Sequence, residues 1–288
     1  MVNKIDLSII IVSYNNKELL RQCLNSIHEN VSTDCHYEII VVDNNSQDNA
    51  VKMLQEEFPY VAVIDNSENY GFAKANNMGL RIAQGRYIIL LNNDTFVLGR
   101  SFETLIEYMD AHPEVGAVSP RLLNGDGVTT QFQGGGSTKK WLSKTPRKVS
   151  FITGAALLIR QAVYKNVGGL DEKFFFYNED LDWCTRMLKA GWQIHYVPLA
   201  SVIHYGGKST HFISKRAIIE GIKGGLYYAY KHYRWALPVY IPLLLLYCLL
   251  EIGISFFKIV FLFQPKAAWE RILAFVTLLG IVLSGRFR

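Results

Sequence analysis

The sequence lacks the short motifs that define several large classes of cofactor-binding protein. Its four cysteines form no CxxC pair and have no metal-ligand spacing, which is typical of reduced thiols in a cytosolic compartment. No GxGxxG follows the first apolar run, and no GxxxxGK[ST] occurs, which argues against a dinucleotide-binding fold and a P-loop ATPase. The first apolar run is short, is interrupted by Ser8 and precedes no small-residue cleavage site, so we expect no signal peptide.

The chain also carries little excess charge, but its basic residues are unevenly distributed. It has 288 residues, 50% of them hydrophobic, and a net charge of +5. That length allows one large domain, or a domain of ordinary size with an appendage. The basic residues gather in the last third, which suits phosphate, nucleic acid or a membrane surface. Because they lie beside an apolar tail and not along an aromatic groove, we expect no nucleic-acid partner.

Four short apolar runs in the first hundred residues have the composition of buried strands. They are LSIIIV (7–12), YEIIVV (37–42), VAVI (61–64) and YIILL (87–91). The stretches between them show apolar residues at helical spacing, for example at Leu20, Leu24 and Ile27. This alternation predicts an α/β fold with a mainly parallel sheet and helices on both of its faces.

Each of these four runs ends in polar residues. The ends are Ser13–Asn16, Asp43–Ser46, Asp65–Asn66 and Asn92–Asp94. Any one of them is compatible with simple turn or helix-cap chemistry. In a parallel sheet, however, ligands bind outside the carboxyl ends of the strands. Four polar ends on one edge therefore predict a rim suited to a nucleotide.

The pattern loosens from about residue 115 to residue 160. Residues 128–148 are rich in Gly, Lys and Thr, which indicates either a functional lid or a plain connector. Residues 151–160, FITGAALLIR, have the composition of a buried strand. A helix is expected to begin near Asn178, with acidic residues in its first turn, and to end at Gly191.

Seven segments together resemble family 2 glycosyltransferases of the GT-A fold, in particular the bacterial rhamnosyltransferase-like branch. The segments, in family order, are LSIIIVSYNN, IIVVDNNSQDN, NYGFAKANNMGL, LLNNDTFV, TGAALLIR, FFFYNEDLDWCTRMLKAGW and VIHYGGKS. The resemblance covers residues 5–215. It implies a Rossmann-like, mixed, mainly parallel sheet and an inverting transferase that uses a nucleoside-diphosphate sugar and a divalent metal.

The resemblance assigns Asn92-Asn93-Asp94 to the metal. Relatives carry an acidic triplet here, which holds Mg²⁺ or Mn²⁺ against the donor diphosphate, and both cations prefer oxygen ligands. In this chain Asn92 replaces the first acid, so Asp94 is the one charged ligand of the triplet. Asn92 is then available to offer a carbonyl oxygen or to bind a ribose hydroxyl. The alternative is that Asp94 caps a following helix.

His204 is the second metal candidate that the resemblance implies. It follows an apolar strand and precedes two glycines, where relatives often use a histidine for the metal or the diphosphate. An imidazole ligand suits Mn²⁺ better than Mg²⁺. A structural histidine at a strand end is the alternative. Lys208 and Ser209 are placed to contact phosphate oxygens.

The acidic cluster at residues 179–182 is the expected catalytic site. On resemblance Asp180 is the catalytic base, and Glu179 and Asp182 hold the acceptor or the local loop. Three carboxylates within four residues raise the proton affinity of one of them, whereas a helix N-terminus favours the anions. The sequence leaves the balance of these two effects open. The alternative is a set of acids that merely decorate a helix start.

The donor is expected to lie along the polar rim. Asp43 is suited to accept the imide N–H of uracil or thymine, which cytosine lacks, so the sequence favours a UDP- or dTDP-sugar. Tyr14 is a candidate for stacking on the base, and Gly71 permits a tight approach to a helix N-terminus. Lys74 is a phosphate partner or a solvated lysine, and Gly154 and Ala155 are small for ligand access or for packing. The expected donor-binding residues are Ser13, Tyr14, Asn16, Asp43, Asn44, Asn69, Gly71, Phe72, Ala73, Asn76, Asn92 and Asn93.

The composition changes at Ala236, where an apolar tail begins. Two stretches are separated by Gln264-Pro265-Lys266; the first is long enough for the roughly 20 apolar residues that a membrane span needs, and the second is short for a span. Each carries polar residues seven apart, namely Glu251 and Lys258 in the first and Glu270, Thr277 and Ser284 in the second. These stripes indicate a membrane-embedded hairpin whose stripes face each other or a second subunit, or helices lying in the interface. A soluble oligomerisation module is the remaining alternative.

The predicted organisation follows from these assignments. A GT-A catalytic domain covers residues 1–215, with a nucleotide-sugar half at about 1–98 and an acceptor half at about 99–215. A basic, aromatic juxtamembrane segment covers 216–235, and an apolar helical hairpin, a possible site of homo-oligomer formation, covers 236–288. We expect the catalytic domain on the cytoplasmic side of the cell membrane, where it transfers rhamnose or a hexose to a lipid-diphosphate-linked saccharide during cell-surface polysaccharide synthesis. The alternative is a non-catalytic nucleotide-sugar-binding assembly protein, against which the intact Asp43, Asp94 and Asp180 argue.

Overall fold

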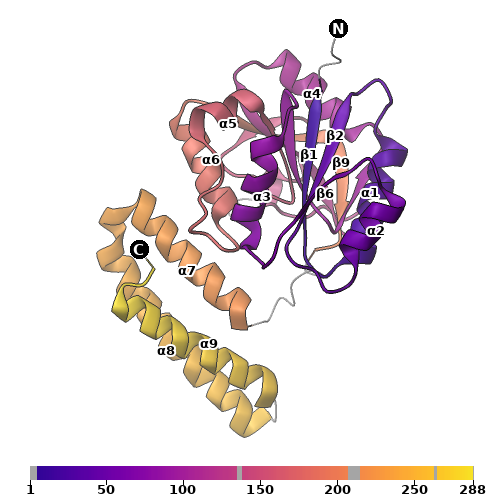
Figure 1. Cartoon of the computed structure of the whole chain (residues 1–288). Coiled ribbons are helices and arrows are strands. Elements are labelled where there is room, and N and C mark those ends of the chain that lie inside the picture. Colours follow the sequence, from indigo (N-terminus) through magenta and orange to yellow (C-terminus); the bar gives the residue numbers. More distant parts are fainter. Residues whose placement is uncertain (1–4, 135–137, 207–214, 263–264, 288) are drawn as a thin grey trace. The chain divides into compact units, whose positions relative to one another are not determined.

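A computed structural model describes residues 5–134, 138–206, 215–262 and 265–287 (Figure 1). The chain divides into two compact units, which are treated separately below. Unit 1 consists of residues 1–173 and 180–209, and unit 2 consists of residues 174–179 and 210–288.

Unit 1 is built on one mixed sheet of nine strands among the described residues. Its order is β3-β2-β1-β4-β8-β6-β9-β5, and β7 pairs with β9 outside this path. The strands are β1 (Leu7–Ser13), β2 (Tyr37–Asp43), β3 (Ala62–Asp65), β4 (Tyr87–Asn92), β5 (Thr95–Leu98), β6 (Val115–Leu123), β7 (Arg147–Val149), β8 (Ala156–Arg160) and β9 (Gln193–His204).

The nucleotide half of the sheet confirms the predicted parallel arrangement. β1 pairs in parallel with β2 and β4, and β2 pairs in parallel with β3. All four predicted apolar runs are strands in this group, with β3 beginning one residue later than the run that predicted it. The antiparallel pairs that make the sheet mixed come from β8, which lies between β4 and β6, and from β5 and β7, which pair with β9.

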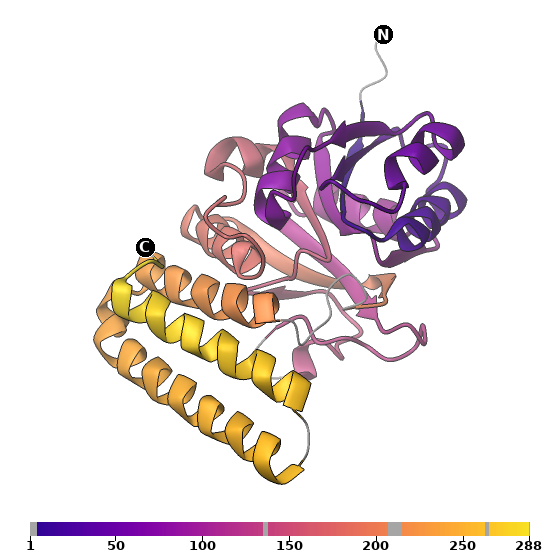
Figure 2. The ribbon, with the colours of Figure 1, turned by 60° about the horizontal axis from the view of Figure 1, so that its bottom comes forward.

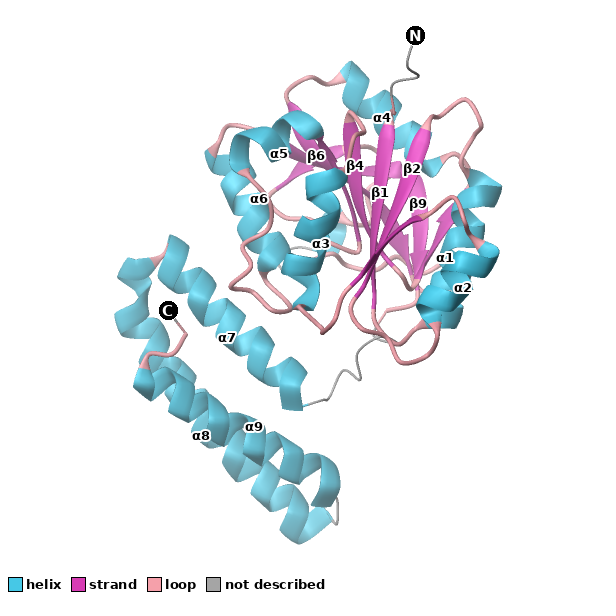
Figure 3. Ribbon diagram, viewed as in Figure 1, coloured by secondary structure: helices cyan, strands magenta, loops and turns pink. Residues whose placement is uncertain are grey.

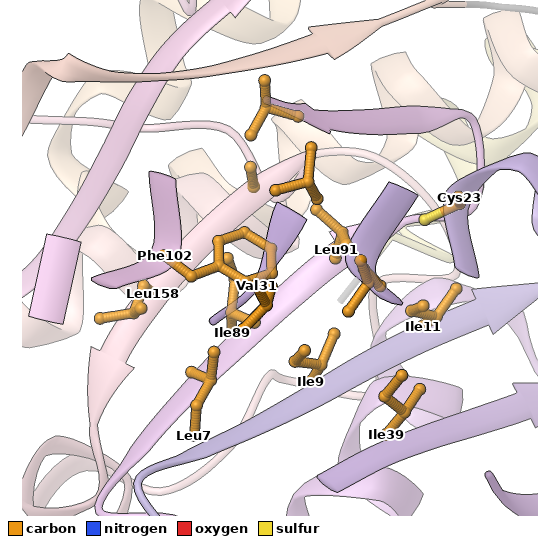
Figure 4. Packing of buried hydrophobic residues seen from close by; sticks show 14 of the residues in the cluster. Leu7, Ile9, Ile11, Cys23, Val31, Ile39, Ile89, Leu91, Phe102 and Leu158 are labelled. Atoms are coloured by element: carbon orange, nitrogen blue, oxygen red, sulfur yellow. The ribbon is translucent and has the colours of Figure 1, made fainter. Parts of the chain in front are cut away.

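Helices cover both faces of this sheet, as Figure 3 shows. They are α1 (Lys17–Asn30), α2 (Ala50–Glu57), α3 (Gly71–Ile82), α4 (Ser101–Ala111), α5 (Gln161–Val167) and α6 (Glu179–Lys189). Because side chains alternate along a strand, Ile9 and Ile11 pack against α1, α2 and α4 (Figure 4). Ile10 points the other way and packs in a second cluster with α3, α5 and α6. Burial on both faces explains why β1 and β4 are apolar throughout and not alternating.

Two local expectations are confirmed and two are corrected. The expected acidic helix is α6, and Gly191 follows its end with a φ of 91°, a conformation that favours glycine. The segment 151–160 forms a strand only from Ala156. The suggestion that Asp94 caps a helix is wrong, because β5 follows at Thr95 and the next helix begins at Ser101. In the described part of residues 124–148, the named elements are the short 3₁₀ helix η1 (Thr138–Lys140) and the start of β7.

Unit 2 is helical. It contains α7 (Lys215–His232), the 3₁₀ turn η2 (Arg234–Ala236), α8 (Leu237–Leu262) and α9 (Pro265–Ser284). Figures 1 and 2 both show α8 and α9 running side by side, and Leu244, Cys248, Phe275 and Leu278 form a shared buried cluster. Two segments, 234–260 and 266–284, are long and apolar enough to cross a membrane by length and composition.

The polar side chains of α8 and α9 only partly follow the predicted stripes. Glu251 of the first stripe accepts a hydrogen bond of 2.7 Å from Arg271 Nη2 of α9. Glu270, Thr277 and Ser284 of the second stripe are exposed, and the two hydroxyls donate to backbone carbonyls one turn earlier in α9. The stripes therefore do not face each other, because Arg271, next to the predicted residue, is the partner of Glu251.

Candidate functional site

The polar ends of the parallel strands lie side by side at one edge of the sheet. Ser13, Asp43 and Asp65 occupy one register position across β1, β2 and β3. The backbone N–H of Asn44 donates to Ser13 O at 2.8 Å, and the Asn93 side chain donates to Ser13 Oγ at 3.5 Å. The structure thus brings the ends of β1, β2, β3 and β4 together into the predicted rim.

The loops after β1 and β2 are bound to each other beyond the strand ends. The Asn15 N–H donates to Ser46 Oγ at 2.9 Å, and the Gln47 N–H donates to Asn15 Oδ1 at 2.7 Å. Asn15 has a φ of 52°, in the left-handed region that Asn tolerates better than most residues. Tyr14 is 43% exposed at this point and offers an accessible aromatic ring. Asn16, partly buried beside it, donates from its side chain to Tyr14 O.

Asp43 is fully buried at the end of β2. Its two carboxylate oxygens accept hydrogen bonds from the N–H and the hydroxyl of Ser46, at 2.7 and 2.6 Å. Desolvation raises the pKa of Asp43 above its ordinary value, and the two hydrogen bonds from Ser46 oppose this rise. Asp43 therefore holds the turn after β2, and its role in binding the base stays a prediction that requires this turn to open.

A tight turn precedes α3 at the same edge. Gly71 has a φ of 81°, its N–H donates to Asn69 Oδ1, and its carbonyl accepts from the Asn44 side chain. A glycine is favoured here because this backbone conformation is costly for other residues. Ala73 and Asn76 are buried within α3, where the Asn76 side chain donates to Phe72 O. Of the expected donor residues on this segment, the turn at Asn69 and Gly71 lies nearest the neighbouring strand ends.

The two predicted metal ligands are in contact, although 110 positions separate them in the chain. β5 pairs antiparallel with β9, which places Thr95 opposite His204, and the Tyr205 N–H donates to Asp94 O at 2.9 Å. As a result, His204 Nε2 lies 3.3 Å from Asp94 Oδ1 and 3.3 Å from Asn92 Nδ2. Asp94 is only 2% exposed.

Gln131 fixes the orientation and the tautomer of His204. Its side-chain Nε2 donates to the backbone carbonyl of His204 at 2.6 Å, and its Oε1 lies 2.9 Å from His204 Nδ1. A carbonyl can only accept, so the amide nitrogen must face His204 O and the amide oxygen must face Nδ1. Neutral His204 is then protonated at Nδ1, and its Nε2 can accept the hydrogen bond from Asn92 Nδ2, with Asp94 Oδ1 beside it.

This donor set fits a divalent cation that is completed by other ligands. It offers one carboxylate, one imidazole nitrogen next to it, and the amide of Asn92, whose nitrogen now faces His204 Nε2. Within the described ranges no three His, Cys, Asp or Glu side chains are grouped closely enough to hold a metal by themselves. A cation bound here would have to take further ligands from water or from a diphosphate, as Mg²⁺ and Mn²⁺ commonly do.

Asp180 lies at the start of α6 and accepts several hydrogen bonds. The Gly154 N–H donates to Oδ2 at 3.0 Å, the Leu181 N–H donates to Oδ1 at 2.8 Å, and the Thr153 side chain contributes another bond. Desolvation raises the pKa of Asp180 above its ordinary value, and these hydrogen bonds oppose the rise without cancelling it. The pKa of Asp180 is thus raised by desolvation, and not by the repulsion among carboxylates that the sequence suggested.

Gly154 and Ala155 connect Asp180 to the metal candidates. A Cβ at Gly154 would lie 3.2 Å from the Phe72 ring and 3.8 Å from Asp180 Cβ, so neighbouring side chains already fill this space. The Asn92 N–H donates to Ala155 O at 2.9 Å. Packing is therefore the reason for the small residue at Gly154. The contacts place Asp180, Phe72 and Asn92 around one point of the rim.

The other two acids of the cluster are buried in different surroundings. Asp182 is fully buried and accepts a 2.8 Å hydrogen bond from Arg186 Nε. The same guanidinium donates to the carbonyls of Val167 and Gly169. Asp182 thus anchors α6 to the segment after α5, which supports the loop-holding role over contact with an acceptor. Glu179, the first residue of α6, is 4% exposed.

Four further positions complete the comparison with the predicted site. Gln131 was not predicted, because nothing in the Gly-, Lys- and Thr-rich stretch around it marks one amide for a distant histidine. Lys74 places its ammonium 3.8 Å from the centre of the Tyr70 ring, a cation–π contact. Lys208 and Ser209 lie outside the described residues.

The mixed sheet, with a parallel half and an acid after β4, is the arrangement expected for the GT-A fold. The model of the family described as glycosyl transferase family 2 matches residues 8–168, which is more than half of the chain. The chain belongs to this family.

Two curated relatives and one solved structure are informative. The chain is 26% identical over 241 residues to the N-acetylglucosaminyl-diphospho-decaprenol L-rhamnosyltransferase of Mycobacterium tuberculosis, covering 71% of this chain and 77% of that protein. It is 27% identical over 235 residues to rhamnosyltransferase WbbL of Escherichia coli, covering 72% and 86%. The mannosyltransferase PcManGT of Pyrobaculum calidifontis, solved with GDP-Man and Mn²⁺, shares the fold with a TM-score of 0.62 at 19% identity, covering 98% and 88%.

Proposed function

We propose that this protein is an inverting, metal-dependent transferase that moves a sugar from a dTDP- or UDP-sugar to a lipid-linked saccharide. The observation that carries the proposal is the contact of Asp94 with His204 at the same rim that holds Asp180. Membership of family 2 supports sugar transfer as the reaction. The names of the rhamnosyltransferase relatives support rhamnose as the sugar and a polyprenyl-diphosphate-linked saccharide as the acceptor.

Asp180 is proposed to act as the general base. Inversion requires that a base take the proton of the acceptor hydroxyl while that oxygen attacks the anomeric carbon. A carboxylate with a raised pKa binds a proton more readily than an ordinary aspartate, and the Gly154 and Leu181 N–H groups hold it in one orientation. The packing of Phe72 on Gly154 places the start of α3 next to this carboxylate.

Asp94 and His204, with Asn92, are proposed to hold the cation. Mg²⁺ or Mn²⁺ bound there would offset the negative charge on the departing diphosphate. Gln131 keeps His204 Nε2 directed toward Asp94, and the turn at Gly71 begins α3, whose N-terminus favours an anion. The donor base is proposed to lie along Tyr14 and the end of β2.

The helices α8 and α9 are proposed to hold the protein at the cytoplasmic face of the membrane. Their large apolar side chains, among them Leu243, Leu246, Leu249 and Phe256, are exposed within unit 2. A lipid surface would remove this area from water. Such a location suits an acceptor whose lipid part is itself embedded in the bilayer.

The pH dependence of turnover is expected to follow Asp180. Because its pKa is raised, the carboxyl binds a proton at a pH where an ordinary aspartate, with a pKa of 3.8, is already ionised. The base works only when ionised, so kcat should fall as the pH drops through this raised value. The folded state binds the proton more tightly than the unfolded state, so stability falls as the pH rises through the same window. This pKa can be measured from the fall of kcat at low pH (the acidic limb of the pH profile), recorded at saturating donor and metal.

A His204 variant tests whether the fall of kcat at low pH belongs to Asp180. A His204→Asn variant should be slower but should keep the limb at the same pH. A limb that disappears in this variant, or a wild-type rate that stays constant down to pH 4, would contradict the assignment.

Gln131 is expected to control metal affinity through His204. Gln131→Leu removes both hydrogen bonds to His204, and loss of such a supporting residue typically costs about 10- to 100-fold in metal affinity. Gln131→Glu retains an acceptor for Nδ1–H and should lose much less. Mn²⁺ titration followed by electron paramagnetic resonance, in the presence of nucleoside diphosphate, compares the variants without relying on turnover. Equal Mn²⁺ affinities for wild type and Gln131→Leu would exclude this role.

A donor panel tests the proposed function most broadly. The purified full-length protein would be incubated with Mn²⁺, dTDP-rhamnose, UDP-hexoses or UDP-N-acetylhexosamines, and a polyprenyl-diphosphate saccharide in detergent. We expect transfer from one of these donors, with inversion at the anomeric carbon. Donor binding with neither transfer nor donor hydrolysis would instead favour the non-catalytic assembly protein.

A further inference from the structure

The segment that enters α6 has a strained backbone. Tyr177 and Asn178 have φ values of 71° and 70°, so two consecutive residues with side chains adopt the left-handed conformation. This conformation is costly for a bulky residue such as Tyr and persists only where the surroundings enforce it. Glu179 and Asp180 follow directly as the first two residues of α6.

Helix α7 provides those surroundings. The Asn178 side chain donates a 3.0 Å hydrogen bond to the Gly221 carbonyl. At Gly224 the backbone of α7 comes so close that a Cβ would lie 2.8 Å from Asn178 Nδ2 and 3.0 Å from Tyr177 O. Only a residue without a side chain fits there without a shift of the strained segment.

Aromatic contacts extend the same interface along the segment. The rings of Phe174 and Tyr227 meet edge to face with centroids 5.0 Å apart, and the Arg216 guanidinium lies 4.1 Å from the centre of the Phe175 ring. Residues 174–179 therefore form one compact unit with the C-terminal helices and not with the sheet that precedes them in the chain.

Helix α7 is in turn fixed by the rest of unit 2. Leu226 is buried in a cluster with Leu237, Phe275 and Leu278, and the ring of Tyr230 lies against Phe287. The backbone of α7 thus presents a rigid surface, because movement at Gly224 would disturb the packing of Leu226 two residues away.

We propose that α7 is a positioning element for the catalytic base. By holding Tyr177 and Asn178 in the left-handed conformation, Gly221 and Gly224 set the point at which α6 begins and hence the position of the Asp180 carboxylate. Base catalysis depends on geometry at the level of fractions of an ångström, so a displaced helix start would reduce turnover more than donor binding. The inference rests on the proposed role of Asp180 as base.

Gly224→Ala tests this inference, with Gly225→Ala as its matched control. Both changes add one methyl group to the same helix and raise helix propensity equally. The methyl at 224 meets Asn178 and Tyr177, whereas the methyl at 225 meets only the Tyr240 hydroxyl at 3.7 Å. We expect kcat of the full-length Gly224→Ala protein to fall at least about tenfold with the donor KM within twofold of wild type. Gly225→Ala should match wild type in both constants.

Hydrogen–deuterium exchange gives a readout that does not depend on turnover. Peptides covering residues 174–182 should exchange faster in Gly224→Ala than in wild type and should be unchanged in Gly225→Ala. If the wild-type protein transfers no sugar but this exchange difference appears, the proposed function fails and the positioning role stands. If transfer occurs and Gly224→Ala equals Gly225→Ala in kcat and in exchange, the positioning role is overturned.

A second variant covers the case in which Gly224→Ala does not fold. Asn178→Gly adds no bulk and tolerates a positive φ, but it removes the hydrogen bond to Gly221. It should lower kcat several-fold at unchanged donor KM. A wild-type kcat in Asn178→Gly would overturn the proposal.

Discussion

Asp180→Asn is expected to lower the rate of sugar transfer by about 100- to 10,000-fold, the range that a positioned general base typically contributes. The amide keeps the shape of the side chain but cannot take the proton of the acceptor hydroxyl. It also keeps an oxygen that can accept from either Gly154 or Leu181, so the start of α6 should stay in place. Donor affinity should therefore remain within about threefold of wild type, as measured by calorimetry with the nucleotide sugar and Mn²⁺.

The stability of Asp180→Asn should change little, because two effects oppose each other. Removing a carboxylate whose pKa is raised by desolvation stabilises the folded state at neutral pH. Leaving one backbone N–H facing the amide NH₂ costs about 1–3 kcal/mol. Asp34→Asn, the same change at an exposed turn, serves as the control and should retain full activity. An Asp180→Asn protein with more than half of the wild-type turnover would exclude Asp180 as the base.

Asp94→Asn is expected to lower kcat/KM by about 100- to 1,000-fold at a fixed, low Mn²⁺ concentration. The change removes the carboxylate of the proposed metal site, and a bound cation contributes several kcal/mol to the stabilisation of developing charge. Each 1.36 kcal/mol corresponds to a factor of ten in rate. Raising the Mn²⁺ concentration should recover part of the loss, because the His204 and Asn92 ligands remain.

The Asn92→Asp variant tests the same site by adding a carboxylate instead of removing one. It adds a second carboxylate at the side chain whose Nδ2 now lies 3.3 Å from His204 Nε2. Mn²⁺ should bind this variant more tightly than wild type in the presence of the nucleotide. The metal assignment would be contradicted if Asp94→Asn had normal kcat/KM and Asn92→Asp left the Mn²⁺ affinity unchanged.

The sequence was sufficient to predict the parallel half of the sheet and the place of the rim. Runs such as residues 87–91 are apolar throughout because helices cover both faces, and their polar ends meet because parallel strands end at one edge. The start of α6 and its end at Gly191 also followed from local composition, since capping and macrodipole effects act within one turn.

Features that depend on distant pairing could not be predicted from local patterns. β5 follows β4 after only two residues but pairs with β9 at the far side of the sheet, and this pairing brings His204 to Asp94. The two hydrogen bonds of Gln131 and the ion pair of Asp182 with Arg186 need three-dimensional positions that no spacing rule supplies. The resemblance to the family gave His204 a role, but not the partner that orients it.

The assignment of Glu179 and Asp180 to different units also depends on distant contacts that local sequence patterns do not reveal. Residues 174–179 are contiguous with α6 in sequence, yet they pack on α7, which begins more than 30 positions later. Nothing in FFFYN marks it as a strained segment, and the close approach of the Gly224 backbone to Tyr177 O appears only in three dimensions. Local propensity would have placed Tyr177 and Asn178 in ordinary helix or extended backbone.

The central claim is that Asp94, His204 and Asp180 surround a single sugar diphosphate and its cation. A crystal structure of the full-length protein with Mn²⁺ and a dTDP- or UDP-sugar analogue, recorded at the manganese absorption edge, tests it most directly. The account predicts one anomalous peak within coordination distance of the Asp94 carboxylate and His204 Nε2, with the anomeric carbon facing Asp180. A manganese peak away from Asp94, or a nucleotide bound outside the rim formed by β1, β2 and β4, would contradict it.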